Sequence, residues 1–166
     1  MPQVLKYFLL NCLPMSKSLD INLSTQIAER LSSKANKCFD NAYQAALLDN
    51  SYLYVQGFLV VGVEPYAIME YGWIELEDQI IDPTFVSLNL DAQYLYYFPA
   101  QTLKVKQLKA IIDESKEDYP EDDPLPIYGA TPYEYYGEIM LGGKEYLAAY
   151  QAAEAKIREL APQDNN

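Results

Sequence analysis

The stretch that decides the fold is residues 52–63, which read Tyr-Leu-Tyr-Val-Gln-Gly-Phe-Leu-Val-Val-Gly-Val. The run is almost continuously apolar or aromatic and rich in β-branched side chains, which predicts a central strand covered on both faces. Turn residues at Glu64-Pro65 and Asp78-Gln79 separate it from two further strands. The expected strands are residues 52–63, 67–77 and 79–82, with residues 94–98 as a candidate fourth. Tight connections between consecutive strands predict an antiparallel meander.

Helices are expected both before and after this meander along the chain. Residues 20–35 carry Ile27 and Leu31 at helical spacing, with Asn22 or Ser24 as the capping residue. The acidic, proline-rich stretch 113–126 predicts a solvated loop, and the aromatic stretch 128–136 predicts irregular structure. The expected helices are residues 20–35, 38–48, 103–116 and a last one that follows Gly142-Gly143 and ends at Ala161. This order predicts an α+β fold, with N-terminal helices packed on a central antiparallel sheet and a helix at the C-terminus.

The length and the net charge limit the number of domains and the kinds of partner that can be expected. The chain has 166 residues and a net charge of −12. We expect one domain over residues 1–162 and a flexible tail over residues 163–166. A surface of this charge repels phosphate backbones and anionic lipid, so neither nucleic acid nor a membrane is expected as a direct partner. The 16 tyrosines are either packing material for the core and its rim or an aromatic binding surface.

Cys12 and Cys38 are too few for a disulfide framework, so reduced thiols and a cytoplasmic location are expected. Residues 4–15 are apolar but shorter than the ~20 residues that span a bilayer, and they lack a small-residue cleavage site. The better interpretation is a first strand or buried arm built on Val4, Tyr7, Phe8 and Leu10. We expect no metal and no cofactor, since the chain has no histidine and its acidic stretch lacks the glycine and acid spacing of an EF-hand.

Three short segments fall where they can carry chemistry. They are Lys37-Cys38-Phe39-Asp40-Asn41-Ala42 at a helix start, Tyr71-Gly72-Trp73 in the second strand, and Ile81-Asp82-Pro83-Thr84 after the next turn. A thiol at a helix N-terminus is favoured as the thiolate, because unpaired N–H groups and the helix dipole stabilise negative charge, and Lys37 acts in the same direction. A cysteine nucleophile also needs a base and a group that orients the base, which neighbouring strands can supply.

These segments resemble the papain-like and transglutaminase-like cysteine hydrolases, and more narrowly the bacterial and phage members with a Cys-aromatic-x-Asn-Ala helix. Those members continue with a Tyr-Val-Glu-Gly strand, a His-Ala-Trp strand and an Asp-Pro-Thr end. The corresponding segments here are residues 38–42, Tyr54-Val55-Gln56-Gly57, Tyr71-Gly72-Trp73 and Asp82-Pro83-Thr84. The resemblance covers about a third of the chain. It implies a papain-like or transglutaminase-like core with Cys38 as the nucleophile and Asp82 as the orienting acid.

The histidine position of this pattern is occupied by Tyr71, and the chain contains no histidine at all. A phenol with an ordinary pKa of about 10 is a poor base at neutral pH, and it cannot relay a proton as an imidazole does. We therefore expect Cys38, Tyr71 and Asp82 to be vestigial triad positions. Candidate binding residues from the same motifs are Asn41, Gln56 and Trp73. For all of these positions, ordinary packing or turn formation is the competing interpretation.

Three functions remain open at the level of sequence. The first is a catalytically inactive relative of cysteine hydrolases that serves as a binding or regulatory module, with another protein as its partner. The second is a cysteine-dependent amidohydrolase or acyltransferase that uses Cys38 without histidine. The third is an acidic inhibitor or interaction protein of phage type, which would bind a basic partner through its charge. No motif indicates the oligomeric state.

Overall fold

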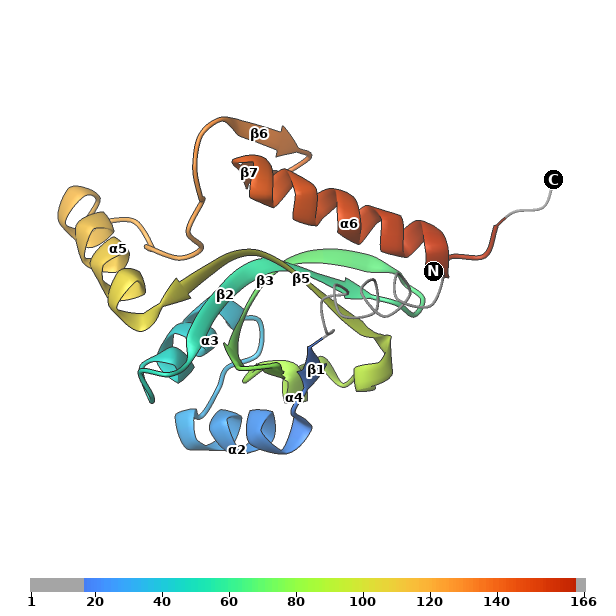
Figure 1. Cartoon of the computed structure of the whole chain (residues 1–166), viewed down its shortest axis with the longest axis horizontal. Helices are drawn as coiled ribbons and strands as arrows, with labels where there is room; N and C mark the ends of the chain where they lie inside the picture. The colour runs from blue at the N-terminus through green and yellow to red at the C-terminus, as the bar shows by residue number, and fades with distance from the viewer. Residues whose placement is uncertain (1–16, 164–166) are drawn as a thin grey trace, which may run out of the picture.

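The computed structural model of the chain describes residues 17–163. The expected N-terminal arm, Cys12 and most of the expected tail, residues 163–166, lie outside these residues. The described part has an α+β fold, as predicted from the order of its segments. A five-stranded sheet forms its centre, and helices lie on both sides of that sheet (Figure 1).

The long central strand confirms the prediction from residues 52–63. Strand β2 (Leu53–Val61) is buried from Tyr54 onward and is paired on both edges. One neighbour is β3 (Ala67–Leu76) and the other is β5 (Leu95–Lys104), and both run antiparallel to β2. The candidate fourth strand therefore exists, although it is longer than the expected residues 94–98 and begins one residue later.

The sheet is mixed rather than purely antiparallel, which corrects the expectation from the sequence. Strand β4 (Gln79–Ile81) pairs antiparallel with β3, as the meander predicts. On its other edge β4 accepts β1 (Ser18–Leu19), which runs parallel to it. The chain reaches α2 along this edge, and a two-residue strand carries no sequence pattern that would reveal it. The strand order is β1-β4-β3-β2-β5.

Four of the helices flank the sheet and one short helix follows β4 (Figure 1). Their bounds are α2 (Ile21–Leu31), α3 (Cys38–Ala46), α4 (Phe85–Leu88), α5 (Val105–Asp118) and α6 (Lys144–Leu160). The cap of α2 is Asp20 and not Asn22 or Ser24, since the Asp20 carboxylate accepts a 2.9 Å hydrogen bond from the Leu23 N–H. The helix ends four residues early because Ser32 adopts a left-handed conformation, with φ of 51°.

Two predictions near the C-terminus are wrong in detail. The acidic stretch that begins at Asp113 is helical as far as Asp118, because its Glu and Lys residues are good helix formers. The stretch 128–136, expected to be irregular, contains β6 (Tyr133–Tyr136). This strand pairs antiparallel with β7 (Ile139–Gly142) in a separate hairpin, and the turn between them uses Gly137 at φ 64°.

The core consists of three groups of buried side chains that share the strands of the sheet. One group joins α2, α3 and α5 to Tyr54 and Ile74. A second joins Trp73 and Tyr71 to the segment around α4. The third joins Phe58 and Val60 to α6 and the β6–β7 hairpin, so that α6 covers its own part of the sheet. Each group draws on β2, which explains why the pattern of this strand decides the fold.

None of the helices in residues 17–163 combines the length and the apolar character that crossing a membrane requires.

Candidate functional site

The helix that begins at Cys38 packs directly against β3. Glycine at position 72 permits this contact, because a Cβ atom there would lie 3.0 Å from Cδ1 of Phe39 and 3.6 Å from Cβ of Ala42. The N-terminus of α3 is thereby held beside the strand that carries Tyr71. The motif positions on the helix and on the strand are thus brought together, as the order of the segments predicts.

The Tyr71 hydroxyl lies against the Asp82 carboxylate. It donates toward Oδ2 at 3.0 Å and is 3.2 Å from Oδ1. Tyr71 is 3% exposed and Asp82 is fully buried. Since Asp82 immediately follows β4 and β4 pairs with β3, the meander itself places the phenol and the acid side by side.

Tyr97 on β5 is a further member of this cluster, and no sequence motif singled it out. Its hydroxyl donates a 2.8 Å hydrogen bond to Oδ2 of Asp82. Tyr97 faces Leu59 of β2, and its ring packs edge-on against the rings of Tyr71 and Trp73. Only the pairing of β5 with β2 brings this tyrosine to Asp82, and that pairing is not visible in the local pattern.

The backbone around Asp82 is fixed on both sides. The Thr84 N–H donates a 2.8 Å hydrogen bond to Oδ1 of Asp82, which forms a tight turn. The Asp82 N–H donates to Oγ of Ser24 at 2.9 Å, which ties the segment to α2. Asp82 is therefore a turn residue, as the competing interpretation held, and also the acceptor for two phenols.

Burial dominates the protonation of this cluster. It raises the pKa of Asp82 to about 6, and hydrogen bonds from Tyr97, the Thr84 backbone and Tyr71 offset only part of that effect. Burial also raises the pKa of Tyr71 far above its ordinary value, and the negative charge of Asp82 raises it further. At neutral pH the phenol is consequently a hydrogen-bond donor and not a base.

The thiol of Cys38 is not activated. Burial raises its pKa to about 11, and the charge of Asp82 adds to the increase. Hydrogen bonds from the backbone of Gly72 and of the helix start act in the opposite direction but are outweighed. The expectation that the helix end and Lys37 would favour a thiolate therefore fails, because Cys38 is partly buried in the apolar group around Trp73.

Asn41 belongs to the same region but serves the scaffold. Its Nδ2 donates to the Lys34 carbonyl at 2.8 Å and to Oγ1 of Thr84 at 2.9 Å. Its Oδ1 accepts from the Lys34 N–H at 3.1 Å. The side chain is buried, and it joins the connection between α2 and α3 to the turn that follows Asp82.

Gln56 and Trp73 are also satisfied inside the protein, and they lie apart from Asn41. The Gln56 amide is buried and joins Tyr54, Tyr146 and the backbone of Ile127. The Trp73 N–H donates a 3.1 Å hydrogen bond to Glu75, whose other carboxylate oxygen pairs with Lys17. The three predicted binding residues thus do not converge on one cavity.

Within residues 17–163, no three side chains of the types that ligate metals gather at one place. Comparison of the chain with protein-family models, with curated proteins and with solved structures finds no match.

Proposed function

We propose that this protein is a catalytically inactive relative of cysteine hydrolases that acts as a binding module for another protein. One observation carries the proposal: the side chain at the base position, Tyr71, donates its hydroxyl proton to Asp82. In a working triad the residue at this position would accept a proton from the thiol. A histidine there would also donate to the acid, but from one ring nitrogen while the other accepts the thiol proton. Tyr71 has a single hydroxyl, whose proton goes to Asp82, and no second nitrogen to act as the base.

The protonation states support the same conclusion. A nucleophilic cysteine acts as the thiolate, and the Cys38 pKa of about 11 leaves almost none at neutral pH. An enzyme that used Cys38 without histidine would need another base near the sulfur. In the described residues the ionisable groups that interact with Cys38 include Asp82, Tyr71 and Tyr54. Burial keeps both phenols protonated, and hydrogen bonds from Tyr71 and Tyr97 already engage the carboxylate. The alternative of an amidohydrolase or acyltransferase therefore has no support in the geometry.

Binding is supported by the distribution of tyrosine. The rings of Tyr54, Tyr71 and Tyr146 are buried, but the five tyrosines between residues 119 and 136 are not. The exposed ones are Tyr119, Tyr128, Tyr133, Tyr135 and Tyr136. Tyrosine is enriched in protein interfaces, because it combines a large apolar ring with a polar end. The core tyrosines have a structural role, whereas this exposed set is available to a partner.

The test is the reaction of Cys38 with iodoacetamide over a range of pH, in a chain that carries Cys12→Ser. We expect the rate at neutral pH to fall below that of a model thiol and to rise only as the pH approaches about 11. In parallel, Cys38→Ser should leave the fold and any partner binding unchanged. Rapid alkylation at neutral pH, or turnover of an amide or ester substrate that Cys38→Ser abolishes, would overturn the proposal.

A further inference from the structure

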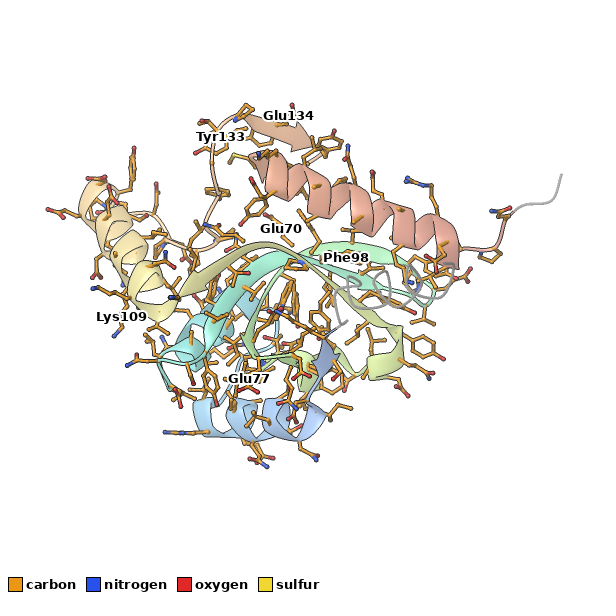
Figure 2. All side chains as sticks on the ribbon, viewed as in Figure 1. Glu70, Glu77, Phe98, Lys109, Tyr133 and Glu134 are labelled. Carbon is orange, nitrogen blue, oxygen red and sulfur yellow. The ribbon has the colours of Figure 1, made fainter. Side chains whose placement is uncertain are left out.

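A groove lies between the C-terminal end of α5 and the loop that leads to β6. Its volume is about 360 Å³, which is in the range of small ligand sites. Ile111, Ile127 and two prolines, Pro124 and Pro126, contribute apolar surface to it. Figure 2 shows Tyr133 at the beginning of β6, near the point where the loop from α5 arrives.

Aromatic rings that the fold does not bury line this groove. Tyr119 is 64% exposed, Tyr128 is 48% exposed and Tyr133 is 50% exposed. They come from three segments, namely the end of α5, the following loop and β6. Rings that gain so little from burial within the chain are available for contact with another molecule.

The groove also lies in a strongly negative segment of the chain. Residues 113–123 hold seven acidic side chains and a single basic one, Lys116. Asp122 and Asp123 line the groove itself. Carboxylates beside exposed phenols form a surface that attracts cations and repels phosphate, so a nucleic acid or an acidic peptide does not fit it.

The walls are held in place by hydrogen bonds from the scaffold. Gln56 binds both the N–H and the carbonyl of Ile127, and the Tyr146 hydroxyl is 3.0 Å from the same carbonyl. Asp123 accepts a 3.0 Å hydrogen bond from the Leu125 N–H, which fixes the turn into the prolines. The buried polar group around Gln56 thus supports the shape of the groove and reduces the ordering that a ligand would require.

We infer that this groove binds an extended, arginine-containing segment of a partner protein. The inference rests on the proposed function and names its surface and the chemistry of its partner. A guanidinium group is planar and stacks on phenol rings, and it can pair with a carboxylate at the same time. Lysine has the charge but not the planar face, so the aromatic rings favour arginine. The prolines and isoleucines provide contacts for the apolar residues between the arginines.

The experiment is a titration of the isotope-labelled full chain with a short arginine–proline peptide, followed by NMR and calorimetry. Matched peptides with lysine or with glutamate replacing arginine are titrated in the same way. We expect shifts confined to the groove, weaker binding of the lysine peptide and none of the glutamate peptide. Tyr119→Ala and Tyr133→Ala should each weaken binding by about tenfold, as interface tyrosines often do. Asp122→Asn should weaken it too and reduce its dependence on salt.

Tyr94→Ala is the matched control, because Tyr94 is exposed immediately before β5 and is not a groove residue. It should bind the peptide as the unmodified chain does. No binding at millimolar peptide, equal binding of the glutamate peptide, or equal losses in Tyr94→Ala and the groove variants would each overturn the inference. With Cys38 still unreactive, these outcomes leave a binding module with a different surface. Cys38-dependent turnover instead removes the proposed function and leaves the groove intact.

Discussion

The Tyr97 hydroxyl donates a 2.8 Å hydrogen bond to Oδ2 of Asp82, the same oxygen that the Tyr71 hydroxyl approaches at 3.0 Å. Two phenols from different strands therefore share one buried acceptor, and Asp82 joins β3, β5 and the turn before α4. In the cysteine triad that these motifs resemble, the acid orients a base. Here the Asp82 carboxylate is the shared acceptor of a buried group of hydrogen bonds. Its protonation state therefore affects the free energy of unfolding.

We predict that Asp82→Asn removes a pH dependence of folding. The pKa of Asp82 is about 6 in the folded chain against an ordinary value of 3.8, so the folded state binds the proton more tightly. Stability from this group is full below about pH 4 and is lost as the pH rises through about 6. A shift of this size corresponds to about 3 kcal/mol. Urea unfolding at a series of pH values should show this loss in the unmodified chain and a flatter profile in Asp82→Asn.

Glu29→Gln provides the control for that measurement, since it removes one negative charge from the exposed face of α2. It should retain the decrease in the free energy of unfolding between about pH 4 and about pH 6. An Asp82→Asn profile that matches that of Glu29→Gln would show that Asp82 is not the group responsible.

We predict that Tyr71→His partly restores the reactivity of Cys38. An imidazole at this position would lie between the thiol and Asp82, where it could accept the thiol proton and stabilise the thiolate as an ion pair. Alkylation by iodoacetamide at neutral pH should rise by about tenfold or more over the unmodified chain. Tyr71→Phe, which removes the hydroxyl but adds no base, should leave the rate low. If the histidine variant folds and reacts as slowly as the phenylalanine variant, the resemblance to a cysteine triad does not extend to its geometry.

Local patterns were sufficient wherever one segment decided its own structure. Residues that are adjacent in the sequence determine three of these features. They are the apolar run of β2, the tight turns of the meander and the apolar spacing of α6. The candidate positions Cys38, Tyr71 and Asp82 were singled out by their resemblance to a cysteine triad, and they lie on a helix, a strand and a turn within a short stretch of chain. The order of these elements predicts that the three positions lie close together. It does not predict the burial that controls their pKa values.

The features that escaped prediction depend on contacts between distant segments. Tyr97 reaches Asp82 only because β5 pairs with β2, with an irregularity between Gln56 and Gly57 that sets the register. The strand β6 reads Tyr-Glu-Tyr-Tyr, and all four residues are exposed, so neither of its faces is buried. Its pairing with β7 comes from the hairpin and not from burial, so a pattern based on burial does not detect it.

We predict that the two central glycines of the sheet differ in their tolerance of alanine. A Cβ at Gly72 would meet the flexible ring of Phe39 at 3.0 Å, whereas a Cβ at Gly57 would lie 2.1 Å from the backbone oxygen of Phe98. The ring can shift but the paired backbone cannot without opening the sheet. Gly72→Ala should destabilise the chain by ~1–3 kcal/mol, within the usual range for overpacking. Gly57→Ala should be worse and yield little folded protein. Equal urea midpoints for the two variants would contradict this.

We predict that Gln56→Leu both destabilises the chain and loosens the groove. The buried amide of Gln56 joins Tyr54, Tyr146 and Ile127, and leucine would leave the Tyr54 hydroxyl and the Ile127 N–H without the partner they have here. The loss should be ~2–4 kcal/mol, since each stranded buried group costs about 1–3 kcal/mol unless water reaches it. Hydrogen exchange should become faster at the Ile127 amide and at its neighbours. The β3 amides that bond to β2 should remain the more slowly exchanging ones, as in the unmodified chain. Tyr54→Phe is the matched control, because it removes one hydroxyl from the group but leaves the amide and its bonds to Ile127 in place. Unchanged exchange at Ile127 in Gln56→Leu would show that the loop is held by its prolines and its packing, independent of this side chain.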